Sequence, residues 1–165
     1  MDGGAILSLL GERFDRGILE THAHCGDHTA VVARGALPDV LRFCRDDPRL
    51  AFEVLMDLTA VDYRAYPGRE DGPRFEVVYH LYSLGHNHRL RLKVPVGEDD
   101  ATVPTAVALW PIANWFEREV WDMFGIRFEG HPDLRRLLMY EEFTGRPLRK
   151  DYPINRRQPL IGPKV

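Results

Sequence analysis

The sequence has few of the residues on which cofactor and nucleophile sites depend. Its two cysteines, Cys25 and Cys44, are too few for an iron–sulfur cluster or a cysteine-rich zinc site. Its two serines, Ser8 and Ser83, do not lie in the strand-to-helix turn that exposes a nucleophilic serine. No glycine-rich loop of the dinucleotide or P-loop type occurs. Nucleotide-dependent and acyl-transfer chemistry are therefore disfavoured.

Long apolar runs and an excess of one charge are also missing. The longest uncharged apolar run is far shorter than the roughly 20 residues that a membrane-spanning helix needs. The N-terminus lacks the basic start and apolar stretch of a secretion signal. The 22 basic and 25 acidic residues give a net charge of −3, which is too balanced to indicate nucleic acid or an acidic membrane as a partner. We expect a soluble, unsecreted protein, and the two cysteines fit a reducing compartment.

The chain has the composition of one folded body with a different C-terminal end. Its 165 residues are 44% hydrophobic and 28% charged, which suits a single hydrophobic core. Residues 130–165 contain eight basic and four acidic residues, so they carry +4 while residues 1–129 carry −7. Their five prolines and three glycines are spaced too closely for regular elements, apart from a short helical turn beginning at Asp133. We expect a globular domain over residues 1–125 and an extended docking tail over residues 126–165.

The hydrophobic periodicity of the globular domain predicts three helices and five strands. Helical spacing of apolar residues predicts helices at residues 5–14, 36–46 and 112–124, the last ending at Gly125. Strands are predicted at residues 18–25, 28–34, 52–60, 75–84 and 88–96. The fold class is α+β: a small, mostly antiparallel sheet with helices packed on one face, followed by an extended Pro/Arg-rich C-terminal tail.

One group of histidines suggests a metal site. His22, His24 and His28, with Cys25 between them, could converge across the turn of the first hairpin and serve a free-standing metal hydrolase. The simpler interpretation is that solvent-facing histidines decorate the hairpin while Cys25 packs as a small apolar group. We favour the simpler interpretation because no carboxylate with a suitable geometry accompanies them.

The helix predicted at 112–124 carries three acidic residues with different expected surroundings. Glu117 and Asp122 point in different directions, so we expect both to be surface charges, with Arg118 pairing to Asp122 four residues on. Glu119 falls at the edge of the apolar stripe, where a carboxylate needs a cationic or hydrogen-bonding partner. Arg127 or an arginine of the tail could supply that partner, in a structural or a catalytic arrangement.

The basic tail has two interpretations. Basic residues interleaved with aromatics between Arg135 and Tyr152 could bind RNA, but the acidic body would repel a phosphate backbone. The alternative is a strap on another protein, because proline stiffening lowers the entropy lost on docking. We favour a protein partner. We further expect that this segment cannot satisfy its own groups and is ordered only by a foreign surface.

Residues 117–153 resemble the signature of a known family. The matching elements are Glu117-Arg118-Glu119, Asp122, Phe124-Gly125-Ile126, the run from Gly130 to Arg136, and the run from Pro147 to Pro153. They are similar to those of the 30-kDa-subunit family, the subunit designated C, of the proton-translocating NADH:quinone oxidoreductase, respiratory complex I. The preceding residues agree with this family in length and in α+β character.

The resemblance implies a structural role without chemistry of its own. Subunits of this family hold no flavin, cluster or quinone, and they sit in the peripheral arm on the cytoplasmic side of the bacterial inner membrane. They contact the membrane only through the assembled complex. Such a non-catalytic subunit supports electron transfer from NADH to quinone coupled to proton translocation.

The resemblance also implies three neighbours within the same complex. The C-terminal segment runs across the subunit designated D, which helps to form the quinone pocket and which we call the quinone-pocket subunit. Beside it lies the cluster-bearing subunit, designated B. The ferredoxin-like subunit, designated I, is a further expected neighbour. An equivalent position in a membrane-bound hydrogenase or a plastid-type dehydrogenase stays an alternative.

The residues that would meet a partner follow from the same resemblance, whereas no catalytic, cofactor-binding or metal-binding residue is expected. The expected partner-binding residues lie in the helix at 112–124 and in the tail: Glu119, Asp122, His131, Asp133, Leu134, Arg135, Arg136, Leu138, Leu148, Arg149, Lys150, Asp151 and Tyr152.

Overall fold

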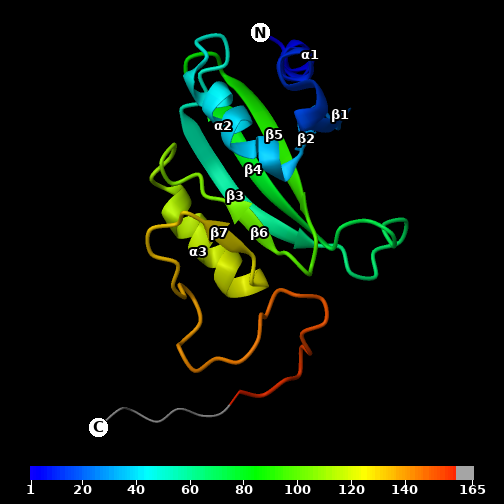
Figure 1. Ribbon diagram of the computed structural model, residues 1–165, viewed down its shortest axis with the longest axis vertical. Helices are drawn as coiled ribbons and strands as arrows, with labels where there is room; N and C mark the ends of the chain where they lie inside the picture. The colour runs from blue at the N-terminus through cyan, green and yellow to red at the C-terminus, as the bar shows by residue number, and fades with distance from the viewer. Residues whose placement is uncertain (159–165) are drawn as a thin grey trace.

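A five-stranded sheet forms the centre of the computed structural model, which describes residues 1–158 (Figure 1). Residues 159–165, the end of the expected tail, lie outside the described residues. The strands are β1 (Ile18–His24), β2 (Asp27–Val32), β3 (Val54–Asp62), β4 (Phe75–Ser83) and β5 (His88–Val96), in the order β1-β2-β5-β4-β3. Only β2 and β5 run parallel among these five strands of the described chain. The structure therefore confirms the α+β class and the mostly antiparallel sheet.

Side-chain alternation along the strands gives the sheet an apolar face. In β5, Leu90, Leu92 and Val94 are buried, while Arg91 and Lys93 between them point to the other side. The register pairs each of these buried residues with a buried apolar residue of β4, so the apolar surface continues across both strands. The apolar face of the sheet must be covered by other parts of the chain, whereas the opposite face can meet solvent.

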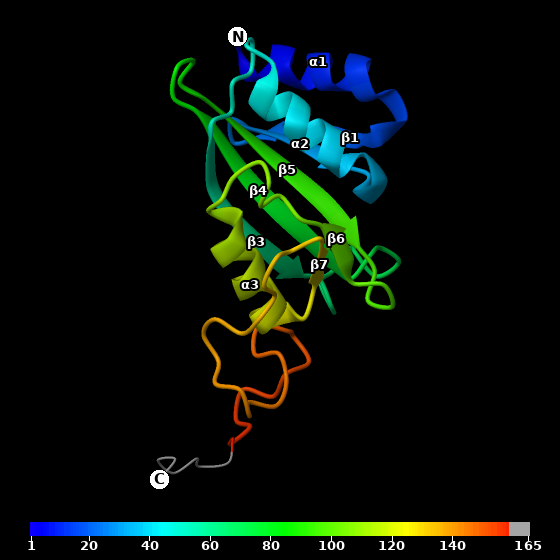
Figure 2. The ribbon, with the colours of Figure 1, turned by 60° about the vertical axis from the view of Figure 1, so that its left-hand side comes forward.

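Three helices pack on the sheet, and their buried apolar residues belong to the same core (Figures 1 and 2). Helix α1 (Gly3–Phe14) begins with the Asp2 carboxylate accepting a hydrogen bond from the Ala5 amide, 2.7 Å. Helix α2 (Leu37–Asp46) turns Val40, Leu41 and Cys44 into the core. Helix α3 (Ala113–Phe124) lies against β3. Short 3-10 turns precede β1 (Asp15–Gly17) and α2 (Arg34–Ala36).

Two short strands extend the body beyond the boundary expected at residue 125. Strand β6 (Thr102–Pro104) pairs in parallel with β7 (Arg127–Glu129), which follows α3 directly. Ile126 and Phe128 are buried in the core. The packed body therefore reaches residue 129. Three-residue strands show too little alternation to be predicted from the sequence.

The remaining described segment, residues 130–158, contains no helix or strand, and we call it the C-terminal segment. The helical turn expected to begin at Asp133 is absent, because the backbone that follows is held by contacts to α3. Figures 1 and 2 show the C-terminal segment looping beyond the end of α3. Within residues 1–158, no helix combines the length and the apolarity that crossing a bilayer requires.

Candidate interaction site

A buried carboxylate on α3 holds the C-terminal segment against the body. Asp122 is fully buried, and its Oδ2 accepts hydrogen bonds from the amides of Leu137, Leu138 and Met139, at 3.1, 2.9 and 2.9 Å. Its Oδ1 accepts from Arg136 at 2.8 Å. Burial alone would raise the pKa of Asp122, but the three amide donors and Arg136 outweigh burial and hold it below its ordinary value. Asp122 is therefore an anchor inside the chain and not the surface charge that the sequence suggested.

Arg118, one turn earlier on α3, supplies the matching donors. Its guanidinium donates from Nε to the carbonyl of Arg135 at 3.2 Å and from Nη2 to the carbonyl of Arg136 at 3.1 Å. It also lies over the Trp115 ring, 5.1 Å from the ring centroid. The expected ion pair between Arg118 and Asp122 does not form, because each side chain binds the backbone of the C-terminal segment instead. Arg118 as donor and Asp122 as acceptor together fix residues 135–139 on α3.

Two tail arginines cap the C-terminal end of α3. Arg146 donates from Nη1 to the carbonyl of Asp122 at 3.1 Å, and Arg149 donates from Nε to the carbonyl of Phe124 at 2.5 Å. The last carbonyls of a helix lack a partner within it, and the negative end of the helix dipole favours cations there. Gly125 ends the helix with φ +81°, and a Cβ at this position would lie 3.0 Å from both guanidinium groups. A glycine therefore satisfies both the backbone conformation and the close approach.

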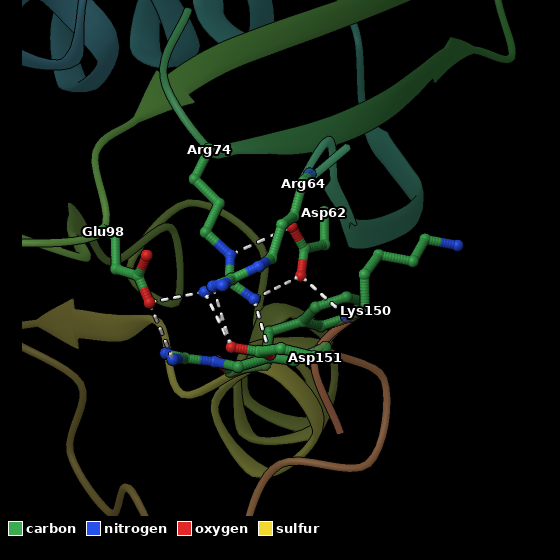
Figure 3. Close-up of polar contacts among 8 residues, drawn as sticks. Asp62, Arg64, Arg74, Glu98, Lys150 and Asp151 are labelled. Carbon is green, nitrogen blue, oxygen red and sulfur yellow. Dashed lines mark hydrogen bonds and ion pairs between the residues drawn. The ribbon is translucent and has the colours of Figure 1, made fainter. Parts of the chain in front are cut away.

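A second charged cluster, which we call the Arg74 cluster, fastens the C-terminal segment at Lys150 and Asp151 (Figure 3). Arg74 Nη2 lies 2.7 Å from Asp62 Oδ2 and 2.7 Å from Asp151 Oδ1. Asp62 also accepts a hydrogen bond from the Lys150 amide at 2.9 Å. Two more charged side chains join the cluster at its outer side: Glu98 pairs with Arg74, and Arg64 pairs with Asp151 (Figure 3).

The charges of the Arg74 cluster compensate one another. Burial raises the pKa of Asp62, but Arg74 and the amides of Lys150 and Arg64 outweigh burial, so that the carboxyl titrates below its ordinary value. The hydrogen bond from Arg74 is the main cause that lowers the pKa of Asp151. Both carboxylates stay ionised at neutral pH, which keeps the cluster closed. The sequence carried one signal for this site, because Asp62 follows Leu58 and Ala60 on the inward-facing phase of β3.

The acidic residues of α3 are placed differently from the sequence expectation. Glu119 is exposed, and among the described residues it makes none of the expected contacts with Arg127 or a tail arginine. Glu117 is the buried one: Thr105 Oγ1 and the Ala106 amide both donate to its carboxylate at 2.6 Å. Burial raises the pKa of Glu117 to about 7, against the smaller lowering effect of these two bonds. The prediction failed because other parts of the chain cover faces of α3 that the sequence pattern assigned to solvent.

The thirteen expected partner-binding residues divide into an inner and an outer group. The inner group makes contacts within the chain. Asp122 is buried, and the contacts of Arg136, Arg149 and Asp151 are those described above. His131 accepts a hydrogen bond from the Asp133 amide at 3.0 Å, and Tyr152 stacks on Phe143. The outer group keeps side chains on the surface: Glu119, Asp133, Arg135, Leu138, Leu148 and Lys150, with Leu134 partly exposed. The expectation that the segment finds no partner groups in its own chain is therefore wrong for the inner group.

The histidines of the first hairpin do not converge. The register sets His22 opposite Thr29 and His24 opposite Asp27, whereas His28 lies opposite Ala23 and so faces the other side of the sheet. Across residues 1–158, no three His, Cys, Asp or Glu side chains are arranged to hold a metal ion. The hydrolase alternative therefore has no ligand set at this hairpin.

Comparison with known proteins identifies the family. Residues 30–158, which include the C-terminal segment and both of its anchors, match the model of the family described as respiratory-chain NADH dehydrogenase, 30 Kd subunit. This chain belongs to that family. The match confirms the resemblance seen in residues 117–153.

Relatives of the 30 Kd subunit family support this assignment in sequence and in structure. The NADH-quinone oxidoreductase subunit designated C of Geobacter sulfurreducens is 44% identical over 155 residues, covering 93% of this chain and 92% of its own. Its counterpart in Acidithiobacillus ferrooxidans is 48% identical over 134 residues, or 81% of this chain, and the match spans only 66% of that relative. Among solved structures, the trypsin-resistant fragment (1-134) of Nqo5 is 36% identical with a TM-score of 0.69, covering 78% of this chain and 98% of the fragment.

A second solved structure comes from a different assembly. A component of the membrane-bound sulfane sulfur reductase, an archaeal respiratory membrane complex, has a TM-score of 0.71 and 27% identity, covering 93% of this chain and 86% of its own. The fold of the 30 Kd subunit family therefore also occurs in that archaeal complex.

Proposed function

We propose that this chain is a non-catalytic structural subunit of the peripheral arm of NADH:quinone oxidoreductase, on the cytoplasmic side of the bacterial membrane. In this role it supports electron transfer from NADH to quinone, coupled to proton translocation, without carrying an electron or a proton itself. The observation that carries the proposal is the family match over residues 30–158, together with relatives named as subunits of that enzyme. The arrangement of charges agrees with it, because Asp122, Asp62 and Arg74 all serve to fasten one part of the chain to another.

The outer group of the C-terminal segment is the part that would meet a neighbour. Leu138 and Leu148 keep 57% and 50% of their area exposed, and burying this apolar area against a partner would favour docking. This surface docks on the quinone-pocket subunit, with the cluster-bearing and ferredoxin-like subunits as further neighbours. The inner group then acts indirectly, by holding the outer residues in place before the partner arrives.

The experiment removes residues 130–165 and measures co-purification with the quinone-pocket subunit of the same organism. The trypsin-resistant fragment of Nqo5 covers 78% of this chain, which supports a truncation that leaves the body intact. We expect the full chain to co-purify and the truncated chain, checked for folding by circular dichroism, to be lost from the complex. The proposal fails if the full chain does not bind the quinone-pocket subunit, or if the folded truncated chain still binds it.

A second candidate is the equivalent position in another membrane-bound respiratory complex. The similarity to a component of the sulfane sulfur reductase favours this second candidate. The match covers 93% of this chain, so it extends beyond the packed body into the C-terminal segment. Purification of the complex through a tagged chain, followed by assays of quinone reduction by NADH and of sulfane-sulfur reduction, separates the two. Quinone reduction by NADH in the purified complex supports the first candidate and rules out the second.

A further inference from the structure

A groove lies between α3 and the C-terminal segment, on the outer side of the bonds that join them. Its volume is about 430 Å³. Arg118 and Trp121 line it from α3, and Leu134, Arg135, Met139 and Tyr140 line it from the C-terminal segment. The groove therefore exists only because the segment returns to the helix.

Bonds within the chain fix the walls of this groove. Asp122 accepts hydrogen bonds from the amides of residues 137–139, and Arg118 donates to the carbonyls of Arg135 and Arg136. The Arg146 guanidinium lies over the Trp121 ring, 4.7 Å from its centroid. A groove whose walls are already ordered costs a partner little conformational entropy on binding.

The groove combines apolar surface with positive charge. Trp121, Leu134 and Met139 supply the apolar surface, and three arginines line the groove against one acidic residue. Two of these arginines, Arg118 and Arg136, are engaged in the bonds that hold the segment.

Arg135 is the groove cation most open to a partner. Its side chain is 70% exposed, and its ion pair with Asp133, 2.9 Å, lies at the surface. A surface ion pair contributes little and exchanges readily for another carboxylate. The bond that holds the segment at this position uses the Arg135 carbonyl and not its side chain. The guanidinium can therefore change partners without loosening the groove.

We propose that this groove receives an acidic segment of the quinone-pocket subunit, an inference that rests on the proposed function and names the chemistry of its contact. An apolar or aromatic side chain of that segment lies on Trp121 and Met139. A neighbouring carboxylate of the same segment pairs with Arg135, whose guanidinium can donate two parallel hydrogen bonds. The occupant is a protein segment and not a nucleic acid, because residues 1–129 of this chain carry a net charge of −7.

The experiment measures the equilibrium dissociation constant between the full chain and the purified quinone-pocket subunit. Arg135→Glu reverses the exposed charge of the groove, and Arg42→Glu is the matched control, because the Arg42 side chain is 62% exposed on α2 and also pairs with a surface aspartate. Tyr140→Ala removes an exposed aromatic from the groove, with exposed Tyr66→Ala outside it as the control. We expect the groove variants to weaken binding at least tenfold and the controls to leave it within twofold.

The outcomes separate this inference from the proposed function. If the unaltered chain fails to bind the quinone-pocket subunit, the proposed function itself is wrong. If the chain binds but either groove variant behaves like its control, the groove is not the contact and only the further inference is overturned. Tighter binding of an oligonucleotide than of the quinone-pocket subunit, weakened by Arg135→Glu, would also overturn it. A weaker salt dependence of binding in Arg135→Glu supports the carboxylate pairing.

Discussion

Glu117 offers the sharpest test of the buried electrostatics, because within residues 1–158 its carboxylate lies in the core without a cationic partner. It accepts hydrogen bonds from Thr105 Oγ1 and the Ala106 amide. The Tyr79 hydroxyl is buried nearby and supplies no positive charge to the carboxylate. The substitution Glu117→Gln keeps the shape of the side chain and removes its ionisation. It therefore isolates the free energy of holding a charge at this position.

The expected magnitude follows from the pKa. Burial raises the pKa of Glu117 from its ordinary 4.5 to about 7, and a tenfold change in proton affinity corresponds to about 1.4 kcal/mol. Between these two values the folded state keeps a proton that the unfolded state has released. The stability from this group is full below pH 4.5 and is lost as the pH rises through 7, a decrease of about 3 kcal/mol in the free energy of unfolding.

Urea unfolding at pH 4.5 and pH 8 measures this effect. Glu117→Gln should reduce the pH-dependent loss of stability by about 3 kcal/mol relative to the unaltered chain. Glu119→Gln, two residues along the same helix and exposed, should leave the pH dependence unchanged. The reasoning is refuted if the chain and its Glu117→Gln variant lose the same stability between the two pH values.

Three further substitutions test the anchors of the C-terminal segment. Asp122→Ala leaves Arg136 and three amides without their acceptor and should lower the free energy of unfolding by about 3 kcal/mol in urea titrations; a loss below about 1 kcal/mol would contradict the anchor role. Gly125→Ala strains a positive φ and crowds two arginines, so we expect the free energy of unfolding to fall by about 1–2 kcal/mol. The control Gly11→Ala, in the open surroundings of α1, should not destabilise the chain. Equal effects of the two substitutions would speak against the close approach of the arginines to Gly125. Arg74→Ala leaves Asp62 buried without its cation, so the variant should be less stable than the unaltered chain by about 3 kcal/mol at pH 7. This loss of stability should shrink at pH 4, where Asp62 can take up a proton. A loss of stability that is independent of pH would exclude this cause.

Elements with strong periodicity were predictable from the sequence. The alternation in residues 75–84 and 88–96 predicted β4 and β5, and the apolar stripe with a final Gly125 predicted α3. The short strands β6 and β7 were missed, because a three-residue parallel pair between segments far apart in the sequence leaves no periodic signal.

The surroundings of individual charges were less predictable. A helical pattern separates an apolar face from a polar face, but it assumes that the polar face meets solvent. In α3 the polar face meets residues 105–106 and the returning C-terminal segment, so Glu117 and Asp122 are buried while Glu119 is exposed. Most donors to Asp122 are backbone amides, which nearly every residue has, so no residue type in the sequence marks them.

The C-terminal segment shows both a correct and an incorrect inference. Its lack of helix and strand was predicted from its prolines and glycines, apart from the turn expected at Asp133. The idea that it depends wholly on a foreign surface was wrong, because Asp122, Arg118 and the Arg74 cluster hold it to its own body. Docking on a neighbour therefore stays a prediction about the outer group of residues.

Hydrogen exchange of the isolated chain tests most directly whether its own body orders the C-terminal segment. The amides of Leu137, Leu138 and Met139 donate to Asp122 within the single chain. We predict that these three amides exchange slowly in the free chain and that adding the quinone-pocket subunit changes them little. Exchange in the free chain as fast as in an unfolded peptide, with protection only after the quinone-pocket subunit is added, would contradict the account.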